Sequence, residues 1–116
     1  MKFEEIKVWQ RSKVLFKEMN NIFNSTKFKD YFFKDQILRA TLSVSNNIAE
    51  GFERETDNEL RRYLYISRGS IGEVRSMLYL ALDCDYINEN KFNDLSIECK
   101  IISSMLYKYI KKIQAL

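Results

Sequence analysis

The stretch TDNELRRYLYISRGSIGEVRSMLYLA, residues 56–81, decides the fold. Thr56 is followed three residues later by Glu59, which is the pattern of a helix capping box. After that start, small or apolar side chains recur at alternating spacings of four and three: Leu60, Leu64, Ser67, Ile71, Val74, Leu78 and Ala81. This spacing is typical of a helix that contributes one seam to a bundle. The sequence therefore predicts a long bundle helix over residues 57–84.

The same periodicity returns after a break at Cys84 and Asp85. Asn88 is expected to cap a helix over residues 89–114. Its seam would consist of Phe92, Leu95, Cys99, Ile102, Leu106, Tyr109 and Ile113. Because Cys99 falls on this seam, we interpret it as a small core side chain and not as a nucleophile.

Two further helices are predicted before residue 56. The helix over residues 5–23 would bury one face, formed by Val8, Ser12, Leu15, Met19 and Ile22. Asp30 would cap a second helix over residues 30–50, and Gly51 would end it in the left-handed conformation. Four helices with short links predict a single all-α domain, an antiparallel up-down-up-down four-helix bundle.

The composition agrees with helices and narrows the possible chemistry. The 116 residues include no proline, three glycines and no histidine. Sheet proteins of this size need more turn residues, and histidine is the commonest general base and metal ligand. The two cysteines have no metal-ligand or redox spacing. We therefore expect no metal, no cofactor, no small-molecule substrate and no enzymatic activity.

Charge and hydropathy leave the choice of partner open. The net charge of +3 is too small to indicate a nucleic-acid partner by itself. The sequence shows no signal peptide and no apolar run long enough to span a bilayer. We therefore expect a cytoplasmic protein with reduced thiols and no membrane partner.

The stretch QILRATLSVSNNIAEG, residues 36–51, carries an unusual set of polar side chains. Paired asparagines lower helix propensity because their amides compete for backbone groups. They indicate either specific hydrogen bonds or a solvated helix end. One hypothesis is that Asn47 and Glu50 are structural, bonding across the junction to the next helix and holding Arg39 or Arg54. The candidate motif residues are Gln36, Asn47, Glu50 and Gly51.

Several of these residues also carry a family resemblance. One bacterial family resembles this chain at VWQ (residues 8–10), Gln36, Arg39, SVSNNIAEG (residues 43–51), Phe52, Arg54 and the segment from Leu64 to Ile87. Its members are four-helix bundle proteins encoded by intervening sequences of 23S ribosomal RNA genes. The family usually has a proline where this chain has Ser45, and another before the second helix. Both losses are expected to straighten or relocate helix starts without abolishing the fold.

The resemblance implies an assembly and a class of partner. Family members resemble bundles that form rings of five. A related bundle, the accessory protein of diversity-generating retroelements, forms a basic ring that binds nucleic acid and a reverse transcriptase. By this analogy the chain would be a homo-pentamer that binds RNA or a ribonucleoprotein. The residues expected to contact phosphate are Arg39, Arg54, Arg61, Arg62, Lys108, Lys111 and Lys112.

One alternative is that the chain binds no nucleic acid. Lysines near a helix end stabilise it through the helix dipole, so Lys108, Lys111 and Lys112 need not bind anything. The chain would then be a purely structural or protein-interaction ring with no nucleic-acid binding. The chain has more large aromatics than the four seams need, so some of them are expected to lie outside the core and to favour self-association: Trp9, Phe28, Phe32, Phe52, Tyr63, Tyr65, Tyr79 and Tyr107.

Overall fold

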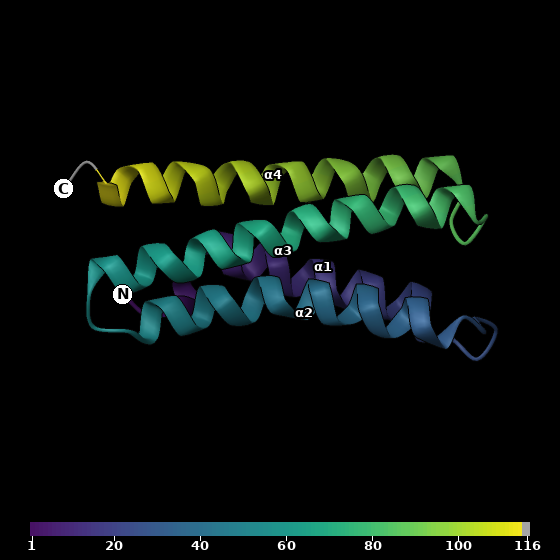
Figure 1. Ribbon diagram of the computed structural model, residues 1–116, viewed down its shortest axis with the longest axis horizontal. Coiled ribbons are helices and arrows are strands. Elements are labelled where there is room, and N and C mark those ends of the chain that lie inside the picture. The colour runs from purple at the N-terminus through teal and green to yellow at the C-terminus, as the bar shows by residue number, and fades with distance from the viewer. Residues whose placement is uncertain (115–116) are drawn as a thin grey trace.

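Four helices account for most of the chain in a computed structural model, which describes residues 1–114. Their bounds are Lys7–Phe23 (α1), Tyr31–Glu53 (α2), Asp57–Asp83 (α3) and Glu89–Gln114 (α4), with a short 3₁₀ turn, Phe3–Glu5 (η1), before α1. Residues 1–114 contain no strand. The helices alternate in direction along a bundle of 47 × 21 × 20 Å (Figure 1). The prediction of an all-α four-helix bundle is confirmed.

The helices pack in chain order around the bundle axis. Each helix contacts the next one in sequence, and α1 also contacts α4, although less extensively than the other neighbouring pairs. In Figure 1, α3 lies between α2 and α4, and α1 lies behind them. Because neighbouring helices run in opposite directions, the end of α2, the start of α3 and the end of α4 meet at one end of the bundle. We call this the basic end.

Side-chain caps fix three helix starts where the sequence predicts them. The Asp30 carboxylate accepts a hydrogen bond from the Phe33 amide at 3.0 Å, and the Thr56 hydroxyl accepts one from the Glu59 amide at 3.2 Å. The Asn88 side-chain oxygen Oδ1 accepts one from the Lys91 amide at 2.8 Å. Each bond satisfies an amide that lacks a partner inside its own helix.

Most of the predicted seam residues form the core, whereas Leu60, Phe92 and Tyr109 are only half-buried against it. In α3 every seam residue from Leu64 onward is buried, and in α4 the same holds for Leu95, Cys99, Ile102, Leu106 and Ile113. Buried Ser67 donates a hydrogen bond of 2.8 Å to the Val44 carbonyl oxygen of α2, so its hydroxyl is satisfied across a helix interface. In α1 the last buried position is Phe23, and the predicted seam residue Ile22 is only half-buried.

The predicted end of α2 at Gly51 is wrong. The helix continues to Glu53, and no glycine in the described residues has positive φ. A Cβ at Gly51 would lie 3.0 Å from the Tyr63 Cβ and 3.1 Å from Leu60 Cδ1. Gly51 therefore lets α2 and α3 approach closely. The extra turn places the Phe52 ring edge-on against Tyr109 of α4, with ring centres 5.4 Å apart.

The first helix begins two residues later than predicted. Phe3–Glu5 form the 3₁₀ turn, and Ile6 is extended with φ −84° and ψ 122°. The Phe3 ring packs edge-on against Trp9 at 5.1 Å, which holds the turn against α1. None of the helices within residues 1–114 has the length and apolar composition that crossing a bilayer would require.

Candidate nucleic-acid interface

Antiparallel packing gathers most of the predicted contact residues at the basic end. Arg54 follows α2, Arg61 and Arg62 lie in the first turns of α3, and three lysines lie in the last two turns of α4. Those lysines are Lys108, Lys111 and Lys112. Arg39 is separate from this group, because it lies near the middle of α2 beside Phe16 of α1.

The first cluster at the basic end surrounds Tyr63 and is largely neutralised. The guanidinium carbons of Arg54 and Arg62 lie 5.1 and 5.9 Å from the centre of the Tyr63 ring. Arg54 also donates to the Tyr63 hydroxyl oxygen at 2.9 Å. Glu50 and Glu59 lie 3.8 and 3.7 Å from the Arg54 guanidinium, so much of its charge is compensated locally.

The second cluster lies between α3 and α4 and keeps its positive charge. Arg68 and Lys111 lie over the Tyr107 ring, at 4.8 and 5.4 Å from its centre. Nearby, the Tyr65 hydroxyl oxygen accepts a hydrogen bond from Gln114 at 3.4 Å. Residues 60–72 of α3 and 99–114 of α4 contain no Asp or Glu. Cations and exposed aromatic rings therefore alternate here without a compensating acid on either segment.

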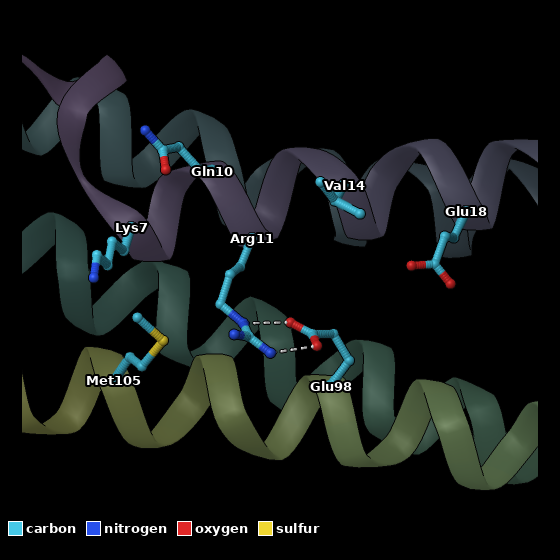
Figure 2. Close-up of a pocket in the computed structure, with 7 residues that line it drawn as sticks. All are labelled: Lys7, Gln10, Arg11, Val14, Glu18, Glu98 and Met105. Atoms are coloured by element: carbon cyan, nitrogen blue, oxygen red, sulfur yellow. Dashed lines mark hydrogen bonds and ion pairs between the residues drawn. The ribbon is translucent and has the colours of Figure 1, made fainter.

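The third cluster lies between α1 and α4. Lys112 lies 5.9 Å from the centre of the Tyr109 ring, and Lys108 and Lys112 border a groove with apolar walls. Beside this groove, α1 faces α4 across a second pocket, with a volume of about 430 Å³, whose lining residues Figure 2 shows. Arg11 spans it with two hydrogen bonds of 2.8 Å to the Glu98 carboxylate. This ion pair joins the two neighbouring helices with the least extensive contact.

The motif residues Gln36, Asn47 and Glu50 of α2 differ in their contacts. Asn47 donates to the Ser43 carbonyl and hydroxyl oxygens at 2.8 and 2.9 Å, and the Ser43 hydroxyl lies 2.9 Å from that of Ser70 in α3. Within residues 1–114, the hydrogen bonds of Asn47 thus reach α3 only through Ser43. Glu50 pairs with Arg54 and not with Arg39, and Gln36 is exposed.

Three ionisable groups elsewhere have shifted pKa values. At the far end of the bundle, the hydrogen bond from the Tyr86 hydroxyl and then the bond from the Phe33 amide lower the pKa of Asp30. The same bond to Asp30 is the main reason that the pKa of Tyr86 rises to about 12. Burial raises the pKa of the Cys99 thiol to about 12, so the thiol stays protonated at neutral pH. Within residues 1–114 no three His, Cys, Asp or Glu side chains gather closely enough to hold a metal ion.

Residues 4–108 match the family model described as 23S rRNA-intervening sequence protein, which covers most of the chain. The chain belongs to this family.

A solved structure agrees with the assignment to the 23S rRNA-intervening sequence protein family at the level of the fold. It is the crystal structure of a protein of unknown function from the S23 ribosomal protein family of Bacteroides thetaiotaomicron. The two chains superpose with a TM-score of 0.82 at 22% sequence identity, covering 90% of this chain and 98% of the other. No curated protein matches the chain.

The arrangement of the second cluster could not be predicted from the family motif. The motif of this intervening sequence protein lies on α2, whereas Tyr65, Arg68 and Tyr107 lie on α3 and α4. The sequence predicts only that some of eight large aromatics, Tyr65 and Tyr107 among them, lie outside the core. The spacing of Arg61, Tyr65 and Arg68, at i, i+4 and i+7, was the available signal that they share a helix face.

Proposed function

We propose that this chain is a non-catalytic, self-associating bundle that binds RNA through its basic end. One observation carries the proposal: the facing segments 60–72 of α3 and 99–114 of α4 bear seven basic side chains and no acidic one. These side chains are Arg61, Arg62, Arg68, Lys100, Lys108, Lys111 and Lys112. Such an excess of positive charge on two neighbouring helices favours a polyanion, because each phosphate that is bound releases condensed counterions.

The lack of ion pairs on these two segments within residues 1–114 supports the proposal. Among the described residues the ion pairs involve only Arg11 and Arg54. The seven basic side chains of the two segments are therefore available to phosphate without first breaking an ion pair. An arginine can donate two hydrogen bonds to one phosphate, which makes Arg61 and Arg68 the stronger contacts.

Self-association is supported by apolar side chains on the surface. Phe32 is 79% exposed and Tyr31 57%, and Leu80 and Ile97 are also more than half exposed. Large exposed apolar groups are typical of surfaces that meet a partner. With +3 on each chain, a ring of five, the order that the family resemblance implies, would carry about +15 and attract RNA much more strongly than a monomer.

The alternative is a ring that binds itself or another protein and no nucleic acid. It is favoured by the first cluster at the basic end, around Tyr63, where Glu50 and Glu59 already compensate the charge of Arg54. In that case the remaining cations would contact acidic groups of neighbouring subunits. Such a protein would assemble normally and would not bind RNA at low salt.

Matched charge variants distinguish the two functions. We would replace Lys108, Lys111 and Lys112 with Gln in one variant, and Lys17, Lys27 and Lys29 in another. Both variants lose three exposed positive charges, but the second loses them towards the far end of the bundle. Fluorescence anisotropy with a labelled RNA at low salt should show weak binding by the first variant and near-normal binding by the second. Equal loss in both, or no binding by the unmodified protein, would reject the basic end as the RNA site.

A further inference from the structure

A stripe of alternating arginine and tyrosine runs along the outside of α3. It consists of Arg61, Tyr65, Arg68, Gly72, Arg75 and Tyr79, which alternate at spacings of four and three. Each position directly follows a seam residue, so the stripe lies next to the buried face. At 1.5 Å per residue it is about 27 Å long. We call it the Arg-Tyr stripe.

Contacts place the stripe along the border with α4. Arg68 lies over the Tyr107 ring, Tyr65 bonds Gln114, and the Tyr79 ring packs edge-on against Phe92 at 4.9 Å. From α4, Tyr107 and Lys111 extend the surface opposite Tyr65 and Arg68. The stripe and its α4 border thus form one continuous surface, and its half nearer the basic end has no acid on the two segments that form it.

The rings of this surface are accessible to a ligand. Tyr65 is 47% exposed and Tyr107 is 45% exposed. Beyond Arg68 the helix surface is bare at Gly72, where an added Cβ would meet nothing within 4 Å. Two half-exposed rings close to cations are the elements that single-stranded nucleic-acid sites combine, because bases stack on the rings while cations bind the phosphates.

The arginines of the stripe are already positioned. Arg68 and Arg75 are half-buried, and within residues 1–114 their Nε atoms have no hydrogen-bond partner. Neither guanidinium joins an ion pair in that part of the chain. Packing therefore holds both groups in place while their charge remains uncompensated. A guanidinium plane can also stack on a base, so Arg68 can continue the stack begun by Tyr107.

From this arrangement we infer that the Arg-Tyr stripe binds single-stranded RNA and discriminates against duplex RNA. The inference rests on the proposed RNA-binding function and specifies its substrate. In a duplex the base faces are stacked inside the helix, so Tyr65 and Tyr107 would gain nothing, and only the cations would act. An unpaired strand offers both its phosphates and its base faces. The rings therefore give the preference for single-stranded RNA, and the cations contribute to the binding of both single-stranded and duplex RNA.

The test compares ring removal with ring retention in the full-length protein. The probes are a labelled, unstructured RNA dodecamer and the duplex that it forms with its complement, measured by anisotropy at 50 mM salt. Replacing both Tyr65 and Tyr107 with Ala should weaken binding of the single strand at least about tenfold, because each stacked base is lost. The same protein with Phe at both positions should bind like the unmodified chain.

Tyr31→Ala is the matched control for ring removal. Tyr31 is 57% exposed and has the Lys34 ammonium 5.4 Å from its ring centre, so it reproduces the local chemistry at the far end of the bundle. Its removal should leave the ratio of the two affinities unchanged, because any loss through self-association weakens binding of both probes alike. Circular dichroism should show that all variants keep their helix content.

The outcomes separate this inference from the proposed function. Equal affinity for duplex and single strand, or an unchanged affinity in the double Ala variant, would overturn the inference and leave RNA binding intact. Failure of both probes to bind the unmodified protein would overturn both. Tighter binding of the single strand that is lost with Ala and kept with Phe is the expected result.

Discussion

At the scale of single residues, the Asp30–Tyr86 pair connects the cap of α2 to the turn before α4. Tyr86 also packs edge-on against Phe28 and Phe33, with ring centres 4.8 and 5.2 Å away. The Asp30 carboxylate therefore accepts hydrogen bonds from the helix that it caps and from a side chain 56 positions later. One carboxylate fixes two chain segments at this end of the bundle.

This pair predicts a specific loss of stability at alkaline pH. The pKa of Tyr86 is about 12 in the folded protein, against an ordinary value of 10.0. A raised folded pKa means that the bond stabilises the fold fully below pH 10 and ceases to do so as the pH rises towards 12. Urea unfolding should show the unmodified protein more stable than Tyr86→Phe at pH 8, with a difference that shrinks between pH 10 and 12. A constant difference would contradict the assigned role.

Glycines of this chain should respond in opposite ways to replacement by alanine. A methyl group at Gly51 would press against the Tyr63 Cβ and the Leu60 carbonyl oxygen, at 3.0 and 3.3 Å, neither of which is a flexible side-chain end. Overpacking of this kind costs about 1–3 kcal/mol. At Gly69 and Gly72 nothing lies within 4 Å, so alanine should add about 1 kcal/mol of helix propensity each. Thermal melts should show a lower Tm for Gly51→Ala and a higher Tm for the other two.

At the scale of elements, the two seams are the strictest requirement of the fold. Leu64 of α3 and Ile102 of α4 are fully buried. An unpaired carboxylate at either position costs several kcal/mol, which rivals the total stability of a typical domain. Leu64→Asp and Ile102→Asp should therefore abolish the helical signal in circular dichroism. The control variants Ile66→Asp and Ile97→Asp, at exposed positions of the same helices, should fold normally. If they also lose the helical signal, burial in the seams is not the reason that Leu64→Asp and Ile102→Asp fail to fold.

Sequence patterns predicted the elements better than they predicted the pairings between them. The capping residues Asp30, Thr56 and Asn88 are local signals, and each marks a helix start correctly. The role of Gly51 depends on Leu60 and Tyr63 of another helix, so local chemistry suggested a helix end where the chain needed a close approach. The surface near Tyr107 likewise depends on how α3 and α4 align, which no single helix encodes.

At the scale of the whole molecule, the exposed apolar groups predict self-association. Phe32 and Tyr31 sit side by side at the start of α2, and both are more than half exposed. Light scattering on the purified protein should give a mass several times the 13.9 kDa of one chain, five times if the ring that the family resemblance implies is correct. The variant Phe32→Ser should lower that mass if this surface forms the contact. If the unmodified protein gives a single species of 13.9 kDa, it is a monomer, and the self-association in the proposed function is wrong.

The most direct test of RNA binding through the basic end is the slope of log Kd against log salt concentration for a single-stranded RNA. We predict a steep slope, because phosphates bound by arginine and lysine release counterions. In the variant with Gln at 108, 111 and 112, the magnitude of the slope should decrease by about 2 for each subunit that contacts the RNA. The variant with Gln at 17, 27 and 29 should keep the original slope. A slope near zero in the unmodified protein, or one that the two variants change equally, would contradict the account.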